Sequence, residues 1–105
     1  MTEIHIPFLD QFKEPMLNGT KTMTSRNSWY GTLGDVFTAF GATFKIVAQQ
    51  KILLGVIAHH HFLEEGFNSA DEFIECWKRL HPRKGYTPDL WVKVHIFKRI
   101  KEAQL

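Results

Sequence analysis

The sequence contains a single cysteine, Cys76, in 105 residues. An internal disulfide or a zinc site built from several cysteines is therefore excluded. Cys76 shares the i, i+3, i+4, i+7 pattern of a helix face with Phe73, Trp77 and Leu80. We therefore expect it to be a small buried hydrophobic residue rather than a nucleophile.

Long apolar runs are also missing. The longest run, Ile52 to Ala58, is far shorter than the roughly 20 apolar residues that cross a bilayer. The segment Met1 to Phe8 has no basic leader ahead of an apolar stretch, which is how a secretory signal begins. These absences predict a cytoplasmic protein with no membrane partner.

Internal repeats, low-complexity tracts and linker-like stretches are absent as well, which predicts one domain over residues 1–105. Hydrophobic residues make up 44% of the chain and charged residues 23%, a globular balance. The sequence has no phosphate-binding loop, no Ser-His-Asp order and no zinc-finger spacing, so no cofactor is expected. It does not determine the oligomeric state, and a monomer is the default expectation.

Charge is distributed unevenly, although the net charge is only +2. The five charged residues from Leu63 to Glu75 are all acidic, whereas from Trp77 to Lys101 eight basic residues accompany Asp89 alone. Such asymmetry favours a polyanionic partner for the C-terminal quarter. An ordinary solvated surface accounts for it equally well.

The order of the expected elements predicts an α+β domain. We expect an extended segment at 4–8, a helix to about residue 18, strands at 22–26, from 35 and at 43–54, a short helix at 59–65, a helix from 68 or 69 to 80, and a strand at 90–100. This order indicates a small, mostly antiparallel β-barrel or a strongly curved sheet with flanking helices. The mouth of such a barrel is a natural ligand site.

The last expected strand has two distinct faces. One face is apolar and predicts a core, and the other interleaves aromatic and cationic side chains: Trp91, Lys93, His95, Phe97 and Arg99. The second pattern suits the stacking of bases and the neutralisation of phosphates, so this face and the Arg83-Lys84 loop form a candidate RNA-binding surface. A half-exposed strand whose aromatic residues are covered by a helix is an equally good interpretation.

Residues 19–26 read GTKTMTSR and concentrate hydrogen-bonding side chains. On a strand, Thr22, Thr24 and Arg26 share one face. Lys21 lies just before that strand, and its long stem allows its amine to reach Thr24. In the alternative interpretation the threonines are ordinary strand residues and the two cations are solvated.

Two further groups of polar residues have competing interpretations. Glu72 completes a capping box with Ser69 at a helix start, but it also lies on a flank of the helix that could face a cleft. His59 and His61 would share a face of a strand, as metal ligands do. No third ligand is apparent, so we expect no metal site.

The stretch from Gly19 to Arg26, followed by Gly34-Asp35, resembles the ASCH domain signature. The core of that signature is a glycine, any residue, a lysine, two residues, an acid, one residue and an arginine. Further matches are Glu65-Gly66-Phe67, Ser69, Glu72-Phe73-Ile74, Trp77, His81-Pro82, Gly85-Tyr86 and the strand from Val94 to Phe97. The resemblance spans residues 16–98 and implies a PUA-like fold, which is a β-barrel with flanking helices.

The resemblance also implies an activity. Thr24 stands where the usual signature has an acid, and this feature is similar to a bacterial branch of small ASCH proteins that hydrolyses the acetamide of N(4)-acetylcytidine. By that resemblance Lys21 is the proton acceptor, Thr24 the nucleophile and Glu72 the proton donor. Arg26 and Thr22, on the same strand face as Thr24, are the expected substrate-binding residues. The expected partner is a modified nucleoside or RNA, and a non-catalytic RNA-binding module is the alternative.

Overall fold

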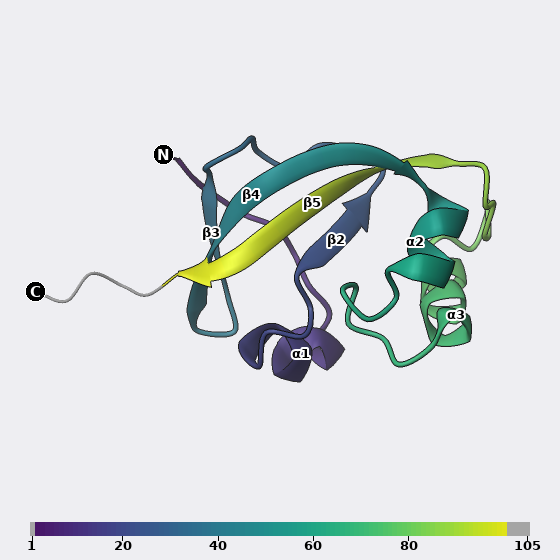
Figure 1. The fold of residues 1–105 in the computed structure, drawn as a ribbon, viewed down its shortest axis with the longest axis horizontal. Coiled ribbons are helices and arrows are strands. Elements are labelled where there is room, and N and C mark those ends of the chain that lie inside the picture. Colours follow the sequence, from purple (N-terminus) through teal and green to yellow (C-terminus); the bar gives the residue numbers. More distant parts are fainter. Residues whose placement is uncertain (1, 101–105) are drawn as a thin grey trace, which may run out of the picture.

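A curved β-sheet with helices on its concave side and at one end forms the framework of the computed structural model, which describes residues 2–100 (Figure 1). The strands lie in the order β1-β3-β4-β5-β2. Their bounds are Glu3–Ile4 for β1, Met23–Arg26 for β2, Val36–Ala39 for β3, Ala42–Leu53 for β4 and Trp91–Ile100 for β5. Among the strands of the described residues, only β1 and β3 run parallel; the other neighbouring strands are antiparallel.

The predicted α+β class is confirmed, but the predicted barrel is not seen. Within residues 2–100, β1 and β2 are the two edges of one sheet and do not pair with each other. The long pair β4 and β5 curves strongly instead (Figure 1). A register shift between Ile46 and Ala48 marks a bulge in β4, and a bulge bends and twists the strand that carries it. Lys101, the last residue of the basic segment, lies outside the described residues.

Four helical segments within residues 2–100 cover the concave side and one end of the sheet. They are the 3-10 turn η1 (Asp10–Phe12), α1 (Lys13–Leu17), α2 (Leu54–His60) and α3 (Ala70–Leu80). In Figure 1, α1 lies below β2, while α2 and α3 lie together where β4 ends. None of the helices in the described part of the chain combines the length and apolar character of a membrane span.

Helix α3 begins and ends as the sequence predicts. The hydroxyl of Ser69 accepts a hydrogen bond of 3.2 Å from the backbone N–H of Glu72, which is the serine half of the predicted capping box. The helix ends at Leu80, directly before His81-Pro82. Both signals are local in sequence, which is why they could be read without a structure.

Helix α2 begins earlier than predicted, at Leu54 rather than at residue 59, and ends at His60 rather than at residue 65. The backbone N–H groups of Leu54 and Gly55 donate to the carbonyls of Leu90 and Pro88, and these bonds end the strand. His59 therefore lies on a helix, so its expected pairing with His61 on a strand face is wrong. Among residues 2–100, no group of three or more His, Cys, Asp or Glu side chains is arranged to hold a metal ion.

The expected stacking face of β5 is wrong for two of its members. His95 is 0% exposed and Phe97 2%, whereas Trp91 is 59% exposed. The ring of Phe97 packs against Phe37 and Phe44, with centroids 5.4 and 5.5 Å away. The curvature of the sheet and the segments that cross it bury this part of β5, so His95 and Phe97 cannot stack on bases at the surface.

Candidate functional site

A cavity of about 460 Å³ opens between β2, the N-terminal segment and α3. Its volume lies within the usual range for small-molecule sites, roughly 300 to 1,000 Å³. Its polar lining includes Lys21, Thr24, Ser25, Arg26 and Glu65. Its apolar lining includes Phe8, Phe12, Tyr30, Phe67, Phe73, Cys76 and Trp77.

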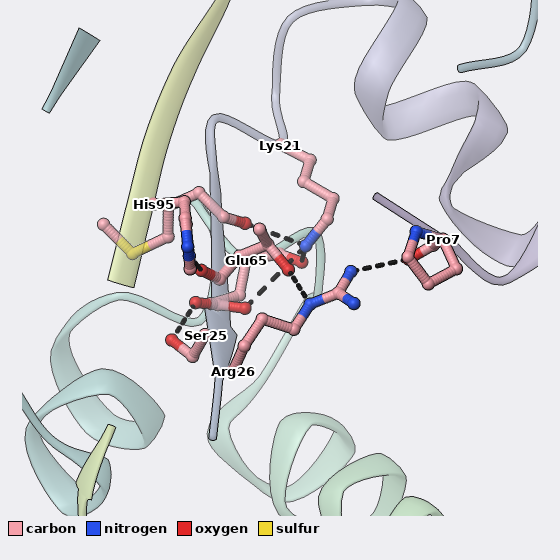
Figure 2. Close-up of polar contacts among 8 residues, drawn as sticks. Pro7, Lys21, Ser25, Arg26, Glu65 and His95 are labelled. Carbon is pink, nitrogen blue, oxygen red and sulfur yellow. Dashed lines mark hydrogen bonds and ion pairs between the residues drawn. The ribbon is translucent and has the colours of Figure 1, made fainter. Parts of the chain in front are cut away.

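Lys21 is buried in this cavity, with 2% of its surface exposed. Its Nζ donates to the carbonyl of Met23 at 2.9 Å and to the carbonyl of Glu65 at 2.6 Å (Figure 2). The same nitrogen lies 3.7 Å from Oε1 of Glu65 and 4.3 Å from the ring centroid of Phe12. Loss of hydration lowers the pKa of Lys21 to about 8; the carboxyl of Glu65 opposes this change and the cation of Arg26 adds to it.

The loop between α2 and α3 docks directly on the start of β2. The carbonyl of Glu64 accepts hydrogen bonds from the backbone N–H groups of Thr22 and Met23, at 2.8 and 3.0 Å. Gly66 has φ of +97°, and a Cβ there would lie 3.1 Å from Cδ of Lys21. The lack of a side chain at Gly66 therefore lets the loop lie against the stem of the lysine.

Glu65 carries the buried carboxyl of the site, with 4% exposure. Oγ of Ser25 lies 2.6 Å from its Oε2, in a hydrogen bond from serine to carboxylate (Figure 2). Burial raises the pKa of Glu65 above its ordinary value, while the cation of Lys21 and the bond from Ser25 oppose this rise. The pKa values of Lys21 and Glu65 thus move toward each other, which brings the neutral pair closer in free energy to the ion pair.

Thr24 is buried and hydrogen-bonded to Arg26. Nε of Arg26 donates to Oγ1 of Thr24 at 2.9 Å, and Nη2 donates to the carbonyl of Pro7 at 2.6 Å. The guanidinium lies 5.1 Å from the ring centroids of both Phe8 and Tyr30. Because Oγ1 accepts from Arg26, the hydroxyl hydrogen of Thr24 is free to be donated to a base.

The structure brings together three of the five residues expected at the site, namely Lys21, Thr24 and Arg26. Thr22 does not line the cavity. Strand β2 begins only at Met23, so the alternation of side chains along the strand does not extend back to Thr22. The carbonyl of Thr22 accepts a hydrogen bond of 2.9 Å from the backbone N–H of Phe97.

Glu72 also lies elsewhere, and the expected meeting of its carboxyl with Lys21 and Thr24 does not occur. It is exposed on the first turn of α3, in a separate hollow that it shares with Gln11, Asp71, Glu75 and Arg79. Helix α3 faces the cavity with Phe73, Cys76, Trp77 and Leu80, the stripe predicted from the sequence. The carboxyl in the cavity belongs to Glu65.

Sequence reasoning missed Glu65 and Ser25 as site residues. Side chains alternate between the two faces of a strand, so the sequence placed Ser25 on the opposite face of β2 from Thr24 and Arg26. The hydroxyl of Ser25 nevertheless reaches Glu65. The sequence did contain one signal for Glu65, which directly precedes Gly66 in a short segment without helix or strand periodicity. A glycine with φ above zero often marks a place where a loop lies close against another element.

No protein-family model matches the sequence, and no curated protein matches it either. Solved structures do. An ASCH domain from Lactobacillus crispatus JV V101 has a TM-score of 0.68 and 12% identity, with 93% of this chain and 79% of that chain covered. The hypothetical protein PH0355 has a TM-score of 0.66 and 13% identity, with coverages of 89% and 94%.

A third solved structure, protein EF3133 from Enterococcus faecalis V583, described by the family model DUF984, has a TM-score of 0.61 and 14% identity. The matched region covers 86% of this chain and 67% of EF3133. At these identities the similarity concerns the fold. The protein is therefore an α+β domain with an ASCH-like fold, whose cavity contains a buried lysine and a buried glutamate.

Proposed function

We propose that the protein is an amidohydrolase that removes the acetyl group from N(4)-acetylcytidine or a related N-acylated nucleoside. One observation supports this most strongly: a buried lysine with its pKa lowered to about 8 shares a cavity with a threonine hydroxyl and a buried carboxyl. A threonine is a weak nucleophile unless a neighbouring base takes its proton. Lys21 is the base that the cavity supplies.

The cavity can prepare Lys21 for this role. Two N–H groups of the neutral amine can be held by the carbonyls of Met23 and Glu65, which leaves the lone pair free. At pH 7 a lysine with a pKa of about 8 is neutral in roughly one molecule in ten. An ordinary surface lysine is neutral in fewer than about one in a thousand.

The first half of the reaction forms an acyl-enzyme. Oγ1 of Thr24 attacks the acetyl carbon, and its proton passes to Nζ of Lys21. The N–H groups of Arg26 that are not bonded to Thr24 and Pro7 stabilise the oxyanion. The bond from carbon to N4 then breaks as Glu65 donates its proton to N4, which releases cytidine and leaves an acetyl ester on Thr24.

The second half restores the site. Water attacks the ester carbon and gives a proton to the Glu65 carboxylate, and the protonated Lys21 returns its proton to Oγ1 of Thr24. The products are acetic acid and the starting pair of neutral Lys21 and protonated Glu65. The aromatic lining of the cavity gives the pyrimidine ring surfaces on which to stack.

Acetate release tests this proposal. Purified protein should hydrolyse N(4)-acetylcytidine, and Lys21→Met or Thr24→Val should lower kcat by roughly a thousandfold or more. Thr22→Val is the matched control for Thr24→Val, because its side chain lies outside the cavity lining. Turnover that is unaffected by both site variants would refute the assigned roles.

A non-catalytic RNA-binding module is a second candidate, favoured by the exposed indole of Trp91 and the exposed cations Arg83 and Lys84. His95 and Phe97 are buried and cannot contribute. Binding would therefore depend on Trp91, Lys93, Arg99 and the loop that contains Arg83 and Lys84. RNA affinity should then fall as salt rises and weaken in the variant Lys93→Ala with Arg99→Ala. An RNA affinity that this variant leaves unchanged would exclude this surface.

A further inference from the structure

His95 lies behind the wall of the cavity and is completely buried. Its position on β5 is directly opposite Thr24 on β2, because the two residues are paired in the sheet. Figure 2 shows its ring among the polar groups of the site. A buried polar side chain at this place needs partners for both of its ring nitrogens.

The hydrogen bonds of His95 determine its protonation state. Nε2 lies 2.9 Å from the backbone nitrogen of Tyr30, and Nδ1 lies 3.3 Å from the carbonyl oxygen of Thr24. A backbone N–H can only donate and a carbonyl can only accept. Nε2 must therefore be the acceptor and Nδ1 must carry the hydrogen, which describes a neutral ring in a single tautomer.

Both partners of His95 belong to the cavity. The aromatic ring of Tyr30 lines it and lies over the guanidinium of Arg26, whose centre is 5.1 Å from the ring centroid. Arg26 in turn donates to the hydroxyl of Thr24. The imidazole thus joins the proposed nucleophile to the loop that supplies Tyr30.

The loop between β2 and β3, which carries Tyr30, is held in place by contacts on both sides. Two hydrogen bonds tie it to β5: Tyr30 N–H to His95, and Nζ of Lys93 to the carbonyl of Asn27 at 3.1 Å. The next residue, Gly31, has φ of +67°, and a Cβ there would lie 2.4 Å from Cδ1 of Ile4. The backbone after Tyr30 therefore lies close against the side chain of Ile4, and no other residue than glycine fits there without a rearrangement.

We propose that His95 is a positioning residue, which holds Tyr30 in the cavity wall through Nε2 and the Thr24 carbonyl through Nδ1–H. It acts through these two residues and does not touch the substrate. The effect on turnover rests on the proposed function, but the positioning itself concerns only residues of this chain. The aromatic wall and the stacked Arg26 depend on the neutral tautomer.

The tautomer can be measured directly by nitrogen-15 NMR of the histidine side chains at pH 7. We expect His95 to show a protonated Nδ1 and an unprotonated Nε2. A ring protonated on Nε2, or on both nitrogens, would overturn the proposal, because Nε2 could not then accept from Tyr30. This measurement uses the wild-type protein and does not depend on any activity.

Two matched variants separate the two hydrogen bonds. His95→Gln places an amide oxygen near the former Nε2 and keeps an acceptor for Tyr30, whereas His95→Asn places an amide nitrogen near Nδ1 and keeps only the donor for Thr24. We expect the Tyr30 amide to exchange with solvent about tenfold faster in His95→Asn than in His95→Gln. Equal exchange rates in the two variants would overturn the proposal.

Kinetics with N(4)-acetylcytidine extend the test. His95→Asn should raise KM by about tenfold with a smaller change in kcat, while His95→Gln should keep KM within about threefold of wild type. Equal KM values in the two variants would refute the positioning role. Absence of turnover in the wild type would refute the proposed function alone, since the tautomer and the Tyr30 exchange rates would still decide the role of His95.

Discussion

Lys21 and Glu65 hold one proton between them in the state that the proposed reaction requires. With this proton on Lys21 the two residues form an ion pair, and with it on Glu65 they form a neutral pair. In the neutral pair Lys21 is the base and Glu65 is the acid. Burial favours the neutral pair because it disfavours charge on both groups. Activity should therefore follow the protonation of the pair rather than that of either residue.

The pH dependence of kcat/KM tests this coupling. Above about pH 8 the pair loses its remaining proton, so the rate should decline as pH rises. In acid the pair takes up a second proton at the raised pKa of Glu65, so the rate should also decline there. A rate that rises through pH 8 and then stays level would show that Lys21 acts as a base without an acid at Glu65.

Substitution of the two candidate carboxyls distinguishes the structure from the sequence-based expectation. Glu65→Gln should lower kcat by roughly a hundredfold to ten-thousandfold, the usual contribution of a general acid. It should also lower the pKa of Lys21 further, because the carboxylate that raises it is gone. Glu72→Gln is the matched control and should retain turnover; the opposite result would restore Glu72 as the proton donor.

The residues of the site differ in how far the sequence alone could place them. Thr24 and Arg26 are two positions apart on one strand, so period-two geometry was enough to bring them together. Lys21 is close in sequence, and its stem is long. Glu65 is 40 residues from Ser25, and no local period relates them.

At the scale of elements, the loop from α2 to α3 is what carries Glu65 to the cavity. It docks through backbone bonds from Thr22 and Met23 to Glu64, and it passes over the Lys21 stem at Gly66. These are contacts between segments far apart in the chain. Sequence patterns described each segment but not their docking.

Gly66→Ala tests the importance of this close approach. The new Cβ meets Lys21 at 3.1 Å and Phe12 at 3.2 Å, at a φ of +97°, so we expect a loss of stability and a displaced lysine amine with reduced turnover. Gly41→Ala is the control, because φ is +79° there and nothing lies within 4 Å of the new Cβ. Both should lose about 1 to 2 kcal/mol in the free energy of unfolding from backbone strain, and only Gly66→Ala should lose activity. Equal activities would show that the loop can shift without moving Lys21.

Elements with local signals were predicted well, and those set by partners were not. The cap at Ser69 and the His81-Pro82 stop define α3 within a few residues of sequence. The start of α2 depends on bonds to the segment before β5, and its apolar residues suit a strand equally well. The faces of β5 depend on the curvature of β4 and on the N-terminal aromatic residues that cover them.

For the whole molecule, the buried pair is expected to reduce stability. The pKa of Lys21 is 10.5 in the unfolded chain and about 8 in the native state. This difference in pKa disfavours folding by roughly 3 kcal/mol at neutral pH. A buried ion pair is often neutral or unfavourable compared with an uncharged replacement. The pair therefore has a functional rather than a stabilising role in our proposal.

The double variant Lys21→Met with Glu65→Gln should be inactive yet at least as stable as wild type, by denaturant unfolding. The wild type should gain stability relative to this variant as pH rises from about 8 to 10.5, because only its unfolded state still binds the Lys21 proton in that range. A double variant less stable by about 3 kcal/mol or more would indicate that the pair is structural.

By itself the sequence determined the α+β class, the limits of α3, its apolar stripe and the local cluster of Lys21, Thr24 and Arg26. These features follow from helix and strand periods and from caps, which act over a few residues. Only the tertiary structure decided that the sheet stays open, that His95 and Phe97 are buried and that Glu65 rather than Glu72 supplies the carboxyl. Those outcomes depend on strand curvature and loop docking, in which distant segments must satisfy each other's backbone hydrogen bonds and packing.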